Sequence, residues 1–162
     1  MSNADEILPR LWLGNVRASM DEDFIRANSI DVVFNCTKNL AFSPIIKIKY
    51  RVPVDDNLEE EEIRNMELWS TEIAYKIILE YNQGRTILVH CMAGMQRSAA
   101  SIAFFLIAYH KIHANDAMRY IKERRHIAFH PKANFGRAIE FFDRKFHDEM
   151  LPAMYQIKYK NE

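Results

Sequence analysis

The sequence predicts an α/β fold in which a central, largely parallel, twisted sheet of four to five strands is flanked by helices. Three observations favour this class. Short apolar segments alternate along the chain with longer segments of helical periodicity, which is typical of a parallel sheet covered on both faces. Hydrophobic residues make up 49% of the 162 residues, enough to build one sizeable core. One apolar segment leads through a tight glycine-containing loop into an alanine-rich helix, as at a ligand site on the carboxyl edge of such a sheet.

The first half of the chain supplies most of the predicted strands. Residues 7–13 and 32–36 are apolar and short, and both are expected to be strands. Between them, Met20–Asn28 is expected to form a short helix, because three acidic residues occupy its first turn, where the helix dipole favours them. Residues 45–52 alternate partly between apolar and polar side chains, which indicates a further strand.

The second half is predicted to be mainly helical. A long helix is expected over Leu58–Tyr81, and its apolar residues at helical spacing are expected to form its buried face: Ile63, Met66, Trp69, Ile73, Ile77 and Ile78. Gly84 precedes a strand at about 86–89. Two or three helices are expected after it, at about 97–111, 114–124 and 134–149, and residues 150–162 are expected to form a tail, either ordered or not.

Composition predicts a single cytosolic domain. The length suggests one domain over residues 1–162, with a core at about 7–147. The formal net charge is zero, so no overall field attracts nucleic acid or anionic membranes, and neither is expected as a partner. Two cysteines do not suggest a disulfide-built secreted fold, and no signal peptide or 18-residue apolar run is found. We therefore expect a cytoplasmic protein, with the nucleus also possible; its oligomeric state is left open.

The most informative segment is Val89-His90-Cys91-Met92-Ala93-Gly94-Met95-Gln96-Arg97-Ser98. A strand–loop–helix unit of this kind directs successive backbone N–H groups and the positive end of a helix toward one point, which makes an anion site. The backbone of residues 92–96 (Met92, Ala93, Gly94, Met95 and Gln96) is expected to bind the oxygens of a phosphate, together with Arg97, whose guanidinium can bind two oxygens at once.

The chemistry of this loop indicates nucleophilic catalysis. A helix N-terminus and a nearby cation both lower the pKa of a thiol, so Cys91 is expected to be an anionic nucleophile. Arg97 and the loop amides would stabilise the charge of the transition state. Ser98 is expected to donate a hydrogen bond to the sulfur and improve it as a leaving group, and His90 to fix the loop or tune the thiol.

A general acid is needed to protonate the departing oxygen. Asp55 and Asp56 are the candidates, because they follow a short apolar run and precede the long helix. The alternative is that both belong to the cap of that helix, although Asn57 with Glu60 would make a capping pair without them.

The loop resembles the His-Cys-x5-Arg-Ser signature of the protein tyrosine phosphatase superfamily, and Cys-x-Ala-Gly-x-x-Arg-Ser-Ala is similar to its dual-specificity branch. Residues 11–15, 30–37 and 50–56 resemble the early strand, the second core strand and the general-acid segment of that family. The resemblance runs from about Ile7 to His147 and implies a protein tyrosine phosphatase-like fold of the small, single-domain, atypical type. It carries the general-acid role over to Asp56, with Asp55 as the alternative.

The resemblance implies a metal-independent enzyme without cofactors that hydrolyses phosphotyrosine and phosphoserine or phosphothreonine in proteins through a cysteinyl-phosphate. Two alternatives stay open: a phosphatase for a non-protein substrate, such as a phosphoinositide or an RNA 5′ phosphate, and a non-catalytic phosphate-binding module. Relatives of the first kind carry extra basic residues inside the loop, and none lies between Cys91 and Arg97 here, so the resemblance disfavours that alternative. Relatives of the second kind lack the cysteine, which is present here.

Some second-rank features are also of interest. Some family members form a disulfide between cysteines at the ends of neighbouring strands. Cys36 and Cys91 are expected at such positions, so the resemblance suggests that a disulfide with Cys36 protects Cys91 from over-oxidation. A late basic cluster is read either as ordinary helix surface or as a substrate rim: Arg124, Arg125, His126, Lys132 and Arg137. Pro131-Lys132-Ala133-Asn134-Phe135 departs from the family's Pro-Asn pair. Two histidine pairs have metal-like spacing, but surface or packing roles are favoured and no metal is expected: His110/His113 and His126/His130.

Overall fold

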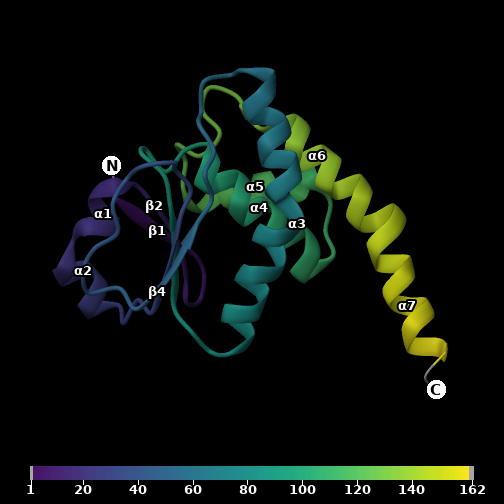
Figure 1. Cartoon of the computed structure of the whole chain (residues 1–162), viewed down its shortest axis with the longest axis horizontal. Helices are drawn as coiled ribbons and strands as arrows, with labels where there is room; N and C mark the ends of the chain where they lie inside the picture. Colours follow the sequence, from purple (N-terminus) through teal and green to yellow (C-terminus); the bar gives the residue numbers. More distant parts are fainter. Residues whose placement is uncertain (1, 161–162) are drawn as a thin grey trace.

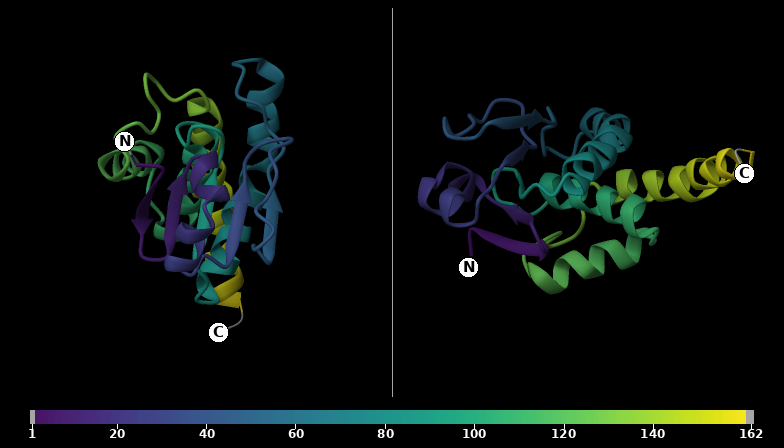
Figure 2. Two further views of the ribbon diagram at one scale, coloured as in Figure 1. Left: turned by 90° about the vertical axis from the view of Figure 1, so that its left-hand side faces the viewer. Right: turned by 90° about the horizontal axis from the view of Figure 1, so that it is seen from below.

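The computed structural model describes the backbone of residues 2–160 and the side chains of residues 2–157. Its centre is a five-stranded sheet in the order β1-β2-β5-β3-β4. The strands are β1 (Ala4–Leu8), β2 (Leu11–Gly14), β3 (Val32–Asn35), β4 (Ile48–Arg51) and β5 (Ile87–His90). All neighbours pair in parallel except β1, which runs antiparallel to β2 along one edge, while β4 forms the other edge (Figure 2). The predicted fold class is confirmed.

The single strand predicted over residues 7–13 is wrong, because the chain folds there into the β1–β2 hairpin. Arg10 in the turn has φ 72°, in the left-handed region that reverses a chain. Its guanidinium Nη1 donates to the carbonyl of Arg85 at 2.8 Å, and the Tyr81 hydroxyl donates to the carbonyl of Pro9 at 2.8 Å. The turn is therefore held from a distant part of the chain, which local sequence does not reveal.

The predicted helix Met20–Asn28 is also divided. The structure has α1 (Val16–Met20) and α2 (Glu22–Ala27), with Asp21 between them in an extended conformation. Asp21 ends the first helix and caps the second, because its carboxylate accepts a hydrogen bond from the backbone N–H of Phe24 at 3.1 Å.

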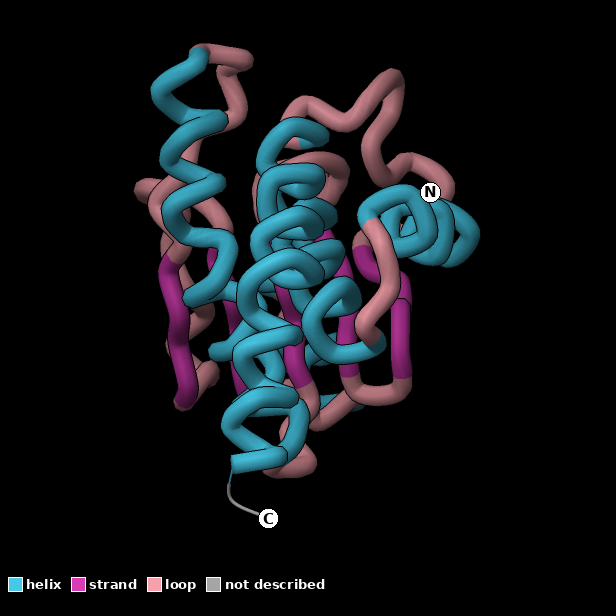
Figure 3. Tube along the Cα trace, turned by 90° about the vertical axis from the view of Figure 1, so that its right-hand side faces the viewer, coloured by secondary structure: helices cyan, strands magenta, loops and turns pink. Residues whose placement is uncertain are grey.

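Helices cover both faces of the sheet. One face is covered by α3 (Glu60–Asn82), α4 (Arg97–His110), α5 (Ala114–Arg124) and α6 (Gly136–Lys145), and the other by α1 and α2 (Figures 1 and 3). Along β3 and β5 every residue is buried, and alternate side chains enter the two cores: Val32, Phe34 and Val89 enter the larger one, whereas Val33 and Leu88 enter the smaller one. The sheet is apolar on both faces because both are covered.

The predicted long helix is confirmed in the structure as α3, with Met66, Ile73 and Ile77 buried as expected and its other predicted apolar residues packed against the same core. Its predicted cap is wrong. Glu59 is the N-cap and makes no side-chain cap bond, while the side-chain Oδ1 of Asn57 accepts a hydrogen bond from the backbone N–H of Glu59 at 3.0 Å. The side chain of Asn57 thus closes the turn before the helix, but it does not accept hydrogen bonds from the N–H groups of the first helical turn.

The C-terminal segment is helical to residue 160. The helix predicted over 134–149 is α6 followed by a π-helical turn, η1 (Phe146–Met150), and α7 (Leu151–Lys160) continues from it and extends away from the body (Figure 1). Among the residues that the structure describes, no helix is both long and apolar enough to cross a bilayer.

Candidate active site

The signature loop, residues 91–96, joins β5 to α4 at the carboxyl edge of the sheet. Because β5 lies between β2 and β3, elements on both sides hold the loop. On one side the N–H of Val16, at the start of α1, donates to the carbonyl of Met92 at 3.1 Å. On the other side the N–H of Cys36, directly after β3, donates to the carbonyl of His90 at 2.8 Å.

The loop requires glycine at position 94. Gly94 has φ 67°, which disfavours any side chain, and a Cβ built there would lie 2.5 Å from the carbonyl oxygen of Gly14 at the end of β2. The loop therefore packs directly on the β2 backbone, and both its curvature and its depth depend on this contact.

Arg125 stabilises the signature loop through hydrogen bonds to its backbone carbonyl groups. It is 2% exposed, and its Nε donates to the carbonyl of Gly94 at 2.8 Å while Nη2 donates to that of Ala93 at 3.3 Å. Asp5 in β1 balances its charge, with Oδ2 2.8 Å from Nη1. Both sequence-based readings of Arg125, surface charge and substrate rim, are wrong. The other four members of that basic cluster are exposed.

The N–H groups of the loop are available to a ligand. Among the described residues, none of the N–H groups of residues 92–96 donates to a protein oxygen. Arg97 has a buried Nε without a hydrogen-bond partner in the described part of the chain, while its Nη1 donates to the carbonyl of Val54 at 3.0 Å. Donors that have no protein oxygen as partner and surround one point favour an anion with several acceptor oxygens.

Cys91 is 3% exposed at the floor of this loop. Burial raises the pKa of its thiol, but hydrogen bonds from the Ser98 hydroxyl and N–H, the charge of Arg97 and the Met95 N–H together outweigh burial, and the pKa is lowered. The Ser98 hydroxyl oxygen lies 3.1 Å from the sulfur. The structure thus brings Cys91, Arg97 and Ser98 together in the way that anionic sulfur chemistry requires.

His90 is the last residue of β5, directly before Cys91, and is fully buried. Burial is the main cause that lowers the pKa of its ring to about 4, so the ring is neutral at physiological pH. Its Nδ1 lies 3.2 Å from the carbonyl oxygen of Cys91, which fits an N–H donor there. His90 therefore contributes loop geometry and no positive charge.

The two candidate acids have different surroundings. Asp56 is exposed, and its Oδ1 accepts a hydrogen bond from Asn134 Nδ2 at 2.9 Å. The backbone N–H of Asn134 in turn donates to the side chain of Gln96 at 2.9 Å. The buried Gln96 amide also donates to the carbonyls of His130 and Lys132, at 3.1 and 2.9 Å. The signature loop is thereby linked to Asp56, and Asn134 reaches it despite the unusual sequence around Pro131.

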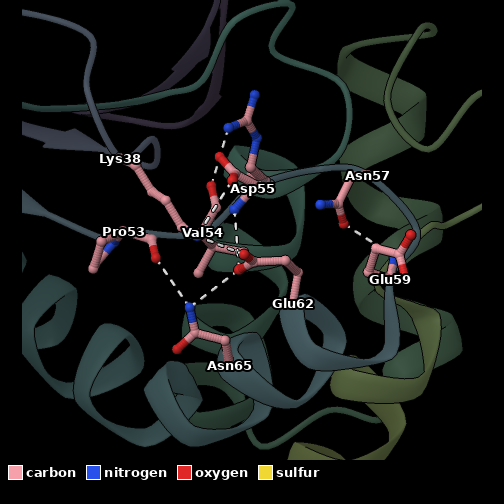
Figure 4. Close-up of polar contacts among 9 residues, drawn as sticks. Lys38, Pro53, Val54, Asp55, Asn57, Glu59, Glu62 and Asn65 are labelled. Carbon is pink, nitrogen blue, oxygen red and sulfur yellow. Dashed lines mark hydrogen bonds and ion pairs between the residues drawn. The ribbon is translucent and has the colours of Figure 1, made fainter.

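Asp55 belongs to an ion-pair network beside the site (Figure 4). Lys38 Nζ lies 3.2 Å from Asp55 Oδ2 and 2.6 Å from Glu62 Oε2. Hydrogen bonding to Lys38 is the main cause that lowers the pKa of Glu62, and the same contacts raise the pKa of Lys38. The carboxylate of Asp55 thus forms an ion pair with Lys38. Among the described residues, the carboxylate of Asp56 forms only a hydrogen bond with the neutral amide of Asn134.

Comparison with known proteins agrees with this geometry. Residues 11–145 match the family described as dual specificity phosphatase, catalytic domain. The chain belongs to this family. Tyrosine-protein phosphatase vhp-1 of Caenorhabditis elegans is 31% identical over 150 residues, which is 90% of this chain and 22% of that protein. Mouse dual specificity protein phosphatase 2 is 33% identical over 122 residues, which is 74% of this chain and 37% of that protein.

Solved structures share the fold of this phosphatase domain. The crystal structure of human DUSP28 superposes with a TM-score of 0.76 at 21% identity, covering 91% of this chain and 97% of that one. The chain spans only about a fifth to two fifths of the length of the curated relatives named above.

Cys36 directly follows β3, as Cys91 directly follows the neighbouring strand β5. Both thiols are free and buried. Burial raises the pKa of Cys36 to about 12, and the contact with Ser101 Oγ at 3.4 Å only partly offsets it. Cys36 is therefore a neutral thiol next to a sulfur whose pKa is lowered, and a disulfide between them stays a prediction.

The pKa of Cys91 should depend on Ser98. Because the hydroxyl hydrogen bond lowers this pKa, Ser98→Ala should move the onset of thiolate formation to higher pH, and the thiolate fraction at pH 6 should fall. Alkylation by iodoacetamide as a function of pH measures it. Cys36→Ser is the control and should leave the profile unchanged; an unshifted profile in Ser98→Ala would contradict the assignment.

Removing the Arg125 guanidinium should loosen the loop. We expect Arg125→Met to destabilise the fold by about 2–3 kcal/mol, below the ~3–5 kcal/mol of a fully buried pair because Asp5 is partly exposed, and to lower kcat/KM about tenfold or more through misplaced loop atoms. Denaturant unfolding and hydrolysis of para-nitrophenyl phosphate measure both. Arg124→Met, on the exposed neighbour, is the matched control; equal effects in the two variants would refute the role.

Proposed function

We propose that this chain is a single catalytic domain that hydrolyses phosphotyrosine and phosphoserine or phosphothreonine in proteins. The observation that carries the proposal is a buried thiol of lowered pKa beside loop N–H groups and Arg97 Nε, which have no protein oxygen as partner among the described residues. A phosphate monoester presents three oxygens to such a site and its phosphorus to the sulfur. Membership of the dual-specificity phosphatase family supports the same substrate class.

In the first step the Cys91 thiolate attacks phosphorus and the bond from phosphorus to the leaving oxygen breaks. Asp56 gives its proton to that oxygen, so a neutral alcohol or phenol departs. The equatorial oxygens are bound by the N–H groups of residues 92–96 and by Arg97, which stabilises the charge that they carry in the transition state. The product is a cysteinyl-phosphate.

In the second step water attacks the phosphorus of this intermediate. Asp56, now ionised, takes a proton from the water, and the sulfur–phosphorus bond breaks. The sulfur leaves as a thiolate, which the Ser98 hydroxyl stabilises by the hydrogen bond already in place at 3.1 Å. Neither step needs a metal ion or a cofactor.

A protein substrate is favoured over a phosphoinositide or RNA end by the surface of the loop. Met92 is 52% exposed at its rim, and no basic side chain lies between Cys91 and Arg97 to bind additional phosphates. An apolar rim suits the side chain and backbone of a phosphorylated peptide. Cleavage of phosphoinositides but not of phosphopeptides would contradict this part of the proposal.

Cys91→Ser should abolish turnover and retain oxyanion binding, because serine at this position lacks the low pKa of the thiol while the N–H groups remain. The assay is para-nitrophenyl phosphate hydrolysis in EDTA, followed by phosphotyrosine and phosphothreonine peptides. Tungstate binding to the variant, measured by calorimetry, controls for folding. Residual turnover near the wild-type rate would refute the nucleophile; binding without turnover in the wild type would make this a phosphate-binding module.

Asp56→Ala should lower kcat about 10²-fold or more for phosphotyrosine and less for para-nitrophenyl phosphate, because only the poorer leaving group depends strongly on a proton. The same series with Asp55→Ala is the matched control and should retain most activity, since Asp55 is paired with Lys38. A larger loss in Asp55→Ala than in Asp56→Ala would transfer the role to Asp55.

A further inference from the structure

Three potential metal ligands meet where α5 begins and α6 ends. His113 directly precedes α5, Asp143 lies in α6, and His147 lies in η1. One ligand atom of each lies within 4.8 Å of the other two, and the centroids of the two imidazole rings are 4.0 Å apart. This is the one such group among the residues that the structure describes.

The spacing of these atoms suits a small divalent ion. His113 Nδ1 lies 2.9 Å from Asp143 Oδ1, and His147 Nε2 lies 3.5 Å from the same oxygen. A tetrahedral zinc ion with bonds of about 2.0–2.1 Å separates its ligand atoms by roughly 3.3 Å. Two of the three ligand–ligand distances therefore already bracket the required value, and the third is no more than 4.8 Å. The proton that His113 Nδ1 donates to Asp143 Oδ1 must move to Nε2 when the ion binds.

The carboxylate is held for such a role. Asp143 Oδ2 accepts a hydrogen bond from the N–H of Ala114 at 2.8 Å, which caps α5 and leaves Oδ1 toward the histidines. Fixed ligands of this kind are typical of metal sites, where a second contact orients each ligand. Asp143 and His147 are four residues apart along the helical backbone, so both project from the same side.

The charge of Asp143 and the solvent exposure of the three side chains also favour metal binding. Among the described side chains, no lysine or arginine forms an ion pair with Asp143. The side chains of Asp143 and His147 are 17% and 16% exposed, whereas that of His113 is 67% exposed. Two ligands of the site, Asp143 and His147, are thus mostly buried, and the Asp143 carboxylate has no lysine or arginine as counter-ion. The third ligand, His113, is open to water.

The backbone around His147 is unusual. Phe146–Met150 is a π-helical turn, in which the N–H of Leu151 donates to the carbonyl of Phe146. Such turns occur frequently at functional sites. His147 Nε2 lies 3.0 Å from the carbonyl oxygen of Ile112, so metal binding requires its proton to move to Nδ1 and this contact to be given up.

We propose that His113, Asp143 and His147 bind one divalent transition-metal ion, Zn²⁺ in particular, with water completing the coordination. No electron is transferred: both imidazoles bind as neutral ligands and the carboxylate as an anion. The ion joins the N-terminal end of α5 to the helical segment that continues into α7. It lies apart from Cys91 and takes no part in phosphate hydrolysis.

The test titrates ZnCl₂ into the Cys91→Ser protein by calorimetry, because the thiolate of the wild type would itself bind zinc. We expect one site with a Kd on the order of micromolar or tighter, and CoCl₂ should give the visible absorption of a four-coordinate nitrogen and oxygen site without a thiolate band. His113→Ala in the same background should weaken zinc binding roughly tenfold or more, since one of three ligands is lost. Absence of zinc binding in the Cys91→Ser protein would overturn the proposal.

His110→Ala is the matched control, an exposed histidine three residues away that belongs to no such group. It should bind zinc as tightly as its parent; a loss equal to that of His113→Ala would overturn the site.

Asp143→Asn is the second ligand variant, because asparagine can still accept the hydrogen bond from Ala114. Zinc should raise the Tm of the Cys91→Ser protein by about 5 °C or more at saturation and leave that of Asp143→Asn nearly unchanged; an equal rise in both would also overturn it.

Discussion

One constraint governs this structure: a short loop must lower the pKa of a thiol that is buried inside the protein. The two cysteines show what this requires, because they follow neighbouring strands of the same sheet and both are buried. At Cys36 burial prevails and raises the pKa to about 12, whereas at Cys91 the loop lowers it. Burial, a serine hydroxyl and the charge of Arg97 act on both thiols, so the difference lies in the backbone N–H groups of Ser98 and Met95, which donate to Cys91 alone. Backbone N–H groups directed toward one point also suit a phosphate.

Directing N–H groups inward has a structural consequence on the other side of the loop. The carbonyl groups of the same peptides point outward, and each must find a donor if it is buried. Arg125 serves Ala93 and Gly94, while Met92 and Met95 accept from the N–H groups of Val16 and Phe129. The loop is thus built by segments more than 100 residues apart in sequence. This explains why a fully buried arginine is tolerated, with Asp5 as its counter-ion.

Sequence patterns sufficed where the determining contacts are local. The strand–loop–helix unit around Cys91 and the buried face of α3 were predictable, because periodicity and motif spacing encode them directly. The β1–β2 hairpin was not, since Arg10 adopts positive φ under contacts from residues 81 and 85. The sequence could not distinguish the buried Arg125 from the exposed Arg124, because the partners of Arg125, Gly94 and Asp5, are about 30 and 120 residues away. The only available signal was a second arginine placed directly after a helix.

The position of the proposed acid depends on the same guanidinium that binds the substrate. Asp56 is in an exposed segment without regular secondary structure, so it needs connections to the loop. One runs through Gln96 and Asn134, and the other through Arg97 Nη1, which holds the carbonyl of Val54 two residues before Asp56. Arg97 Nε has no partner among the described residues. The planar group therefore has one edge for the acid segment and another for two phosphate oxygens, so binding the substrate need not release the acid.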